Sequence, residues 1–157
     1  MHQMEHDATV GKPADVRNGT SSGGRASEPL NEIRGLEPLV ALLGRWEPGD
    51  LCCIESLDWD NTIGSLKLVG LFQRPGIGAW PDPTAPMVRV RLVFEGVYAL
   101  TLRDLNSQVL GFSIDKLSGR QLQSHRFHVT DYEDARIEFF ACGIAVLSAE
   151  TVEPTDD

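Results

Sequence analysis

Two histidines, His125 and His128, have the H-x-x-H spacing that can bind a metal ion. On a helix, side chains three residues apart share one face, whereas on a strand they point to opposite faces. The segment from Arg126 to Thr130 has the alternating pattern of a strand, so we expect the two imidazoles on opposite faces. One metal ion could then not contact both rings, and we predict no metal site here.

Acidic residues gather in two predicted turns. One turn holds Asp131, Tyr132, Glu133 and Asp134, and the other holds Asp58, Trp59, Asp60 and Asn61. Neither follows the twelve-residue ligand pattern of a calcium-binding EF-hand loop. Asp and Asn are common in turns because their side chains bond the local backbone. We therefore expect turn residues rather than metal ligands, and the first cluster is either a solvated surface or an acidic binding face.

A search for a nucleophile or a cofactor loop finds no catalytic pattern. The sequence has no G-x-S-x-G motif, and Cys142 lies in no context that would lower its pKa. Gly76-Ile77-Gly78 follows no strand-to-helix unit of the kind that binds dinucleotides. We predict no catalytic, cofactor-binding or metal-binding residues, and we expect that the protein is not an enzyme.

Length and charge narrow the class of partner. The chain has 157 residues, of which 41% are hydrophobic and 24% are charged, and its formal net charge is −9. This composition is typical of one domain with its own core. The acidic excess argues against nucleic acid as a partner, because phosphate binding needs clustered lysine and arginine. Residues 131–157 hold eight acidic residues and one basic residue, which suits a basic partner.

Cysteine usage and hydropathy indicate a compartment. The chain has three cysteines, Cys52, Cys53 and Cys142. Because their number is odd and two are adjacent, we expect no disulfide framework. Free thiols in a reducing cytoplasm are expected instead. No stretch approaches the length of about 18 apolar residues needed to span a membrane. The N-terminus also lacks the apolar core of a secretory signal. We expect a cytoplasmic protein with no membrane contact.

The chain divides into a tail, one domain and a second tail. Residues 1–28 hold almost no large apolar side chains and are expected to be disordered. Residues 29–150 are expected to form a single α+β domain. Residues 151–157 read as a frayed acidic tail.

Hydrophobic periodicity predicts one helix followed by strands. The helix begins near Glu37, because Pro38 is tolerated only in a first turn, and it ends near Gly44 or Arg45. The predicted strands cover residues 51–57, 64–72, 87–95, 97–103, 109–117, 126–130, 136–142 and 144–149. The connections are too short for crossover helices, so we predict a largely antiparallel sheet of about eight strands, with the N-terminal helix packed on it.

The loop from Gln73 to Pro86 is rich in proline and contains Trp80. Prolines reduce the conformations of the free loop, and Trp is a favoured anchor at protein interfaces. Trp80 is therefore a candidate partner-binding residue, and the alternative is a hairpin loop folded back so that Trp80 covers the core.

Three segments carry a family resemblance. They are Val88-Arg89-Val90-Arg91-Leu92-Val93-Phe94-Glu95-Gly96-Val97, the Gly-Phe-Ser-Ile strand (residues 111–114) and the segment 127–134. Together they resemble immunity protein family 50. The similarity covers about the C-terminal 60 residues. It implies a cytoplasmic bacterial immunity protein that binds and neutralises a cognate toxin. No functional residue is carried over from the family.

These observations favour a non-catalytic protein-binding module of the toxin-inhibitor class. The candidate partner-binding residues are Trp80, Asp131, Tyr132, Glu133 and Asp134. Two alternatives remain open. One is a small-ligand-binding protein or small enzyme with a pocket between helix and sheet, in which His125, His128, Asp131 and Cys142 converge. The other is an assembly subunit that pairs through an edge strand.

Overall fold

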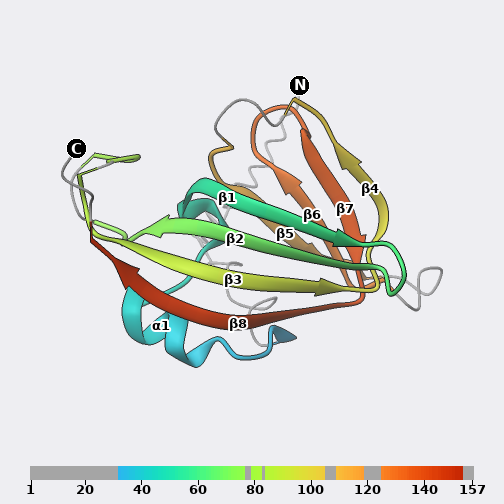
Figure 1. The fold of residues 1–157 in the computed structure, drawn as a ribbon, viewed down its shortest axis with the longest axis horizontal. Helices are drawn as coiled ribbons and strands as arrows, with labels where there is room; N and C mark the ends of the chain where they lie inside the picture. Colours follow the sequence, from blue (N-terminus) through green and yellow to red (C-terminus); the bar gives the residue numbers. More distant parts are fainter. Residues whose placement is uncertain (1–31, 77–78, 83, 105–108, 119–124, 154–157) are drawn as a thin grey trace, which may run out of the picture.

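The computed structural model describes residues 32–76, 79–82, 84–104, 109–118 and 125–153. Eight strands form two antiparallel sheets, in the order β1-β2-β3-β8 and β4-β7-β6-β5 (Figure 1). Their bounds are β1 (Leu51–Asp60), β2 (Ser65–Gln73), β3 (Met87–Glu95), β4 (Tyr98–Leu102), β5 (Phe112–Lys116), β6 (Phe127–Asp131), β7 (Ile137–Ala141) and β8 (Gly143–Val152). The predicted fold class, α+β with mainly antiparallel strands and one α-helix, is confirmed, and the strands divide between two packed sheets.

The chain passes from one sheet to the other at two adjacent corners, Gly96 between β3 and β4 and Cys142 between β7 and β8. The amide of Cys142 donates to the carbonyl of Glu95 at 2.8 Å, and its thiol donates to the carbonyl of Gly96 at 3.5 Å. Gly96 has a φ of +59°, and a Cβ at this position would lie 2.5 Å from Cys142 Sγ. The corner therefore requires glycine for both its backbone conformation and its space.

Aromatic rings from both sheets meet in a single core. Phe94 of β3 packs edge to face on Phe139 of β7 with ring centroids 4.9 Å apart. Phe72 of β2 contacts Phe112 of β5 and also Trp46, which precedes β1, at 6.3 Å and 6.1 Å. Because the Phe94–Phe139 and Phe72–Phe112 contacts join strands of different sheets, they hold the two layers together.

Helix α1 (Glu37–Leu43) lies along β8 at the edge of the first sheet (Figure 1). Pro38 occupies the first turn, where its missing N–H costs no helical hydrogen bond, and Gly44 ends the helix with a φ of +78°. Leu39 and Leu43 are buried in the core. The prediction that the helix begins at Glu37 and ends near Gly44 is confirmed.

The predicted acidic tail is shorter than expected, because Thr151 and Val152 belong to β8 and pair with Val88 and Met87. Residues 1–28 and 154–157, where tails were also predicted, lie outside the described residues. In the part of the chain that the structure describes, no helix has the length and apolar character needed to cross a membrane.

Candidate functional site

Asp131, one of the five candidate residues, is the last residue of β6 and is buried, with 5% of its surface exposed. Its carboxylate accepts a hydrogen bond from the amide of Ile137 at 3.0 Å and lies 3.7 Å from the guanidinium of buried Arg136. Arg136 also pairs with Glu133. The prediction that Asp131 contacts a partner does not fit this geometry, because its carboxylate stabilises the turn instead. Glu133 and Asp134 are exposed.

Tyr132 follows Asp131 and points to another element, the short 3₁₀ helix η2 (Pro48–Asp50). A Cβ at Gly49 would lie 2.7 Å from the Tyr132 hydroxyl, and a Cβ at Gly111 would lie 2.5 Å from the ring. The ring therefore rests on two stretches of bare backbone while 60% of the residue stays exposed. Two glycines far apart in the sequence thus position this aromatic side chain.

The surroundings of Tyr132 are acidic. Partial burial raises the pKa of its phenol, and the charges of Glu47, Asp50 and Asp115 raise that pKa further. The phenol therefore stays protonated at neutral pH and can donate a hydrogen bond. Three carboxylates thus lie near enough to act on this exposed aromatic ring.

Trp80 lies on the other candidate segment, and buried Gln73 at the end of β2 holds that segment in place. The side-chain amide of Gln73 donates to the carbonyl of Ala79 at 2.7 Å, and its oxygen accepts from the amide of Asp82 at 2.8 Å. Burial raises the pKa of the Cys52 thiol, and the side chain of Trp80, which lies near this thiol, opposes that shift with a smaller effect. Trp80 is 46% exposed, so it is anchored at one edge without being covered by the core.

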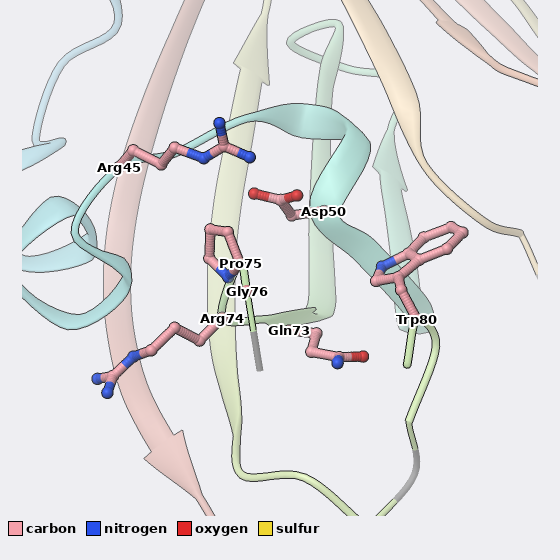
Figure 2. Close-up of a pocket in the computed structure, with 7 residues that line it drawn as sticks. All are labelled: Arg45, Asp50, Gln73, Arg74, Pro75, Gly76 and Trp80. Carbon is pink, nitrogen blue, oxygen red and sulfur yellow. The ribbon is translucent and has the colours of Figure 1, made fainter. Parts of the chain in front are cut away.

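A cavity of about 170 Å³ lies between η2, the end of β2 and Trp80 (Figure 2). Its lining consists of Arg45, Asp50, Gln73, Arg74, Pro75, Gly76 and Trp80. One carboxylate oxygen of Asp50 is buried and has no hydrogen-bond partner. Burial raises the pKa of Asp50, the charge of Arg45 opposes that shift, and Glu47 adds to it. An ionisable group with an unused buried acceptor is thus part of the wall of a surface cavity.

Trp80 and Tyr132 therefore both lie beside η2, one at the cavity lined by Asp50 and the other against Gly49. We call Glu47, Asp50, Trp80 and Tyr132 together the η2 surface. It combines two half-exposed aromatic side chains with two carboxylates on a firmly held backbone. Such a surface can anchor a protein partner through aromatic burial and attract cationic groups.

The two histidines lie elsewhere, on the outer face of the second sheet. The His128 ring stacks on Phe140 with centroids 4.8 Å apart, and the His125 ring lies 6.5 Å from the same phenylalanine. The prediction that they occupy opposite faces is wrong, because β6 begins at Phe127 and strand alternation does not extend to His125. His128 instead makes a 3.0 Å contact with Glu138.

The constellation that would have supported an enzyme is not assembled by the described residues. Asp131 bonds the first residue of β7, whereas Cys142 follows the last, so the two lie at opposite ends of that strand. Within the described ranges, no three His, Cys, Asp or Glu side chains are grouped to hold a metal ion. Burial raises the pKa values of the Cys52 and Cys53 thiols, which keeps both protonated and weakly nucleophilic at neutral pH.

Sequence reasoning missed Arg45, Asp50 and Gln73. Glu47-Pro48-Gly49-Asp50 precedes the predicted strand 51–57 and contains residues typical of turns, but nothing in it indicates a cavity. Gln73 looked like an ordinary loop residue next to the proline-rich segment. A buried glutamine that bonds two backbone groups of one loop can be recognised only once its burial is known.

Comparison with known proteins adds no relative. No protein-family model matches the chain, and no curated protein or solved structure matches it. The geometry of the site is therefore the main basis for a proposal of function.

Proposed function

We propose that this protein is a non-catalytic binding module that contacts a protein partner through the η2 surface. The observation that carries the proposal is the placement of Trp80 and Tyr132 beside the same short helix, 46% and 60% exposed. Tryptophan and tyrosine are the side chains that most often dominate binding energy at protein interfaces.

The support of these two side chains favours the proposal further. Gln73 fixes the backbone on both sides of Trp80, and Gly49 and Gly111 receive the ring of Tyr132. Anchors that are ordered before binding lose less conformational entropy when a partner covers them. An exposed aromatic pair with these supports is therefore suited to recognition.

The more specific proposal is an immunity protein that neutralises a cognate bacterial toxin by direct binding. It draws on the resemblance of the C-terminal strands to immunity protein family 50 and on the net charge of −9. A basic toxin would be attracted to an acidic inhibitor and would associate rapidly. The proposal implies a cytoplasmic protein whose partner is another protein rather than nucleic acid or a membrane.

The test is co-expression with the product of the gene immediately upstream. We expect a stable complex that suppresses the toxicity of that product. Replacing both Trp80 and Tyr132 by alanine is expected to weaken the complex by at least about a hundredfold, because each is placed as an anchor.

The matched control is Trp59→Ala. Trp59 is 38% exposed but lies near the far end of β1, opposite the end that adjoins η2. Its replacement should leave the affinity unchanged. Absence of any complex would contradict the immunity function, whereas a complex that survives the Trp80/Tyr132 replacement would contradict the placement of the interface.

The cavity beside Asp50 favours a second candidate, a small-ligand-binding protein. It lies at the end of β2 rather than between α1 and the sheet, where Leu39 and Leu43 fill the space. At about 170 Å³ it is smaller than the roughly 300–1,000 Å³ typical of metabolite pockets, so this candidate stays second. A thermal-shift screen of metabolites would reveal such a ligand.

A further inference from the structure

Charge pairing distinguishes Asp50 from the other ionised groups that line the cavity. Arg45 forms an ion pair with Glu47 at 3.1 Å. Arg74 donates to the carbonyl of Leu42, at 3.1 Å from Nε and 2.6 Å from a terminal nitrogen, and Figure 2 shows its guanidinium directed away from Asp50. Among the described residues, none donates a hydrogen bond to the buried carboxylate oxygen of Asp50, and Arg45 acts on this carboxylate through its charge.

An unpaired carboxylate in a cavity requires a hydrogen-bond donor, and a positively charged donor gives the stronger bond. Among the described residues that line the cavity, Arg45 is paired with Glu47 and Arg74 is bonded to the carbonyl of Leu42, whereas Asp50 keeps a buried oxygen without a donor. The cavity therefore favours a cation over an anion. The indole of Trp80 adds an aromatic wall, which attracts cations through its π face.

Size then limits what the cation can be. A volume of about 170 Å³ fits one long side chain better than a drug-sized metabolite. The cavity also belongs to the η2 surface, since Asp50 and Trp80 are members of both. A side chain projecting from a bound protein would reach it directly.

We propose that this cavity receives a lysine ammonium or an arginine guanidinium of the partner protein, with Asp50 as its ion-pair acceptor and Trp80 as its aromatic wall. This inference rests on the proposed function, because it identifies the chemistry of one contact in that interface. It also assigns different tasks to the two anchors: Trp80 recognises charge, and Tyr132 contributes buried aromatic area.

The cavity can be tested without the partner. The chain has three tryptophans, so a ¹⁵N spectrum contains three indole signals, and Trp80→Phe identifies the signal of Trp80. The probes are N-acetyl-arginine amide and N-acetyl-lysine amide, titrated at constant ionic strength to about 50 mM, a range that covers weak binding. N-acetyl-norleucine amide is the neutral control, and sodium acetate is the anionic one.

We expect both cationic probes to shift the Trp80 signal to saturation while the Trp59 signal stays in place. Asp50→Asn is expected to weaken this binding about tenfold, because it removes the charge and keeps the shape. Asp134→Asn removes the same charge from an exposed turn and should change nothing. Any one of four results would overturn the inference. They are equal shifts with the norleucine probe, stronger binding of acetate, undiminished binding of the cationic probes to Asp50→Asn, and the absence of a saturable shift.

The result is separable from the proposed function. A toxin complex that forms normally with a cavity that ignores cations would overturn this inference alone. Cation binding in the cavity without any protein complex would instead overturn the proposed function.

Discussion

Asp50 and Asp131 each place a carboxylate oxygen out of contact with water, but their surroundings differ. Asp131 receives the amide of Ile137 and lies beside the guanidinium of Arg136. Asp50 has one buried oxygen with no donor. A buried acceptor without a donor destabilises a fold, whereas a paired one becomes costly to remove. Substitutions at the two positions should therefore change stability in opposite directions.

We predict that Asp50→Asn raises the free energy of unfolding at pH 7, by less than about 1 kcal/mol. Burial raises the pKa of Asp50 in the folded protein above its ordinary value of 3.8. The stability that protonated Asp50 contributes is then fully present below its pKa in the unfolded chain. This stability is lost as the pH rises through its pKa in the folded protein. The gain should appear in urea denaturation at pH 7 and vanish near pH 3. A loss of stability at pH 7 would show that the carboxylate has stabilising partners.

Asp131→Ala should have the opposite effect and lower the free energy of unfolding by about 3 kcal/mol. The substitution leaves the amide of Ile137 without its acceptor and removes a carboxylate from beside buried Arg136. Asp134→Ala, an exposed substitution in the same turn, should cost less than about 0.5 kcal/mol. Chemical denaturation of both variants provides the test, and equal effects would contradict the buried role of Asp131.

At the scale of elements, one side chain of β2 holds the loop that carries Trp80. We predict that Gln73→Leu destabilises this loop by about 1–3 kcal/mol, since the carbonyl of Ala79 and the amide of Asp82 lose their partners. Hydrogen exchange at Asp82 should accelerate, and acrylamide should quench Trp80 more strongly. Thr84→Val, which removes an exposed hydrogen bond to Asp82, should have little effect on either signal. Unchanged exchange in Gln73→Leu would mean that other contacts hold the loop.

The elements themselves were largely predictable. Alternating apolar residues in β3 and the position of Pro38 in α1 gave the correct element types and nearly correct ends. The division into two sheets was not predictable, because it depends on the approach of Gly96 and Cys142, which are far apart in the sequence. Burial of Asp131 was hidden for a related reason: the acidic run resembled a solvated turn until Arg136 folded over it.

The corner itself offers a prediction. Gly96→Ala should cost about 2–3 kcal/mol, from the φ of +59° and from contact with the Cys142 sulfur. Cys142→Ala in the same chain should restore part of this loss, because it removes the sulfur that the new methyl group meets. A double-mutant cycle measured by denaturation gives the coupling energy. Strict additivity would show that the close approach has no energetic consequence.

At the scale of the whole molecule, the two sheets share both strands and core. β3 continues into β4 and β8 is the continuation of β7, and the two pairs hydrogen-bond to each other on either side of the corner. Phe94 and Phe139 pack across the space between the sheets. Neither sheet can bury its apolar face without the other, so local loss of one layer should expose the second.

We therefore predict that the protein unfolds in one cooperative transition and that Phe139→Ala lowers its stability by about 3–5 kcal/mol. Far-UV circular dichroism reports both sheets, and tryptophan fluorescence includes the signal of Trp46, which is buried in the core. Both signals should shift together in the variant, because Phe139 contacts the opposite sheet through Phe94. Leu147→Ala is the control, since Leu147 is 59% exposed on β8 and should contribute less than about 0.5 kcal/mol. Two separate transitions, with only one displaced by Phe139→Ala, would mean that the sheets are independent units. The η2 surface would then lack a common support, because Tyr132 follows a strand of the second sheet and Asp50 leads into the first.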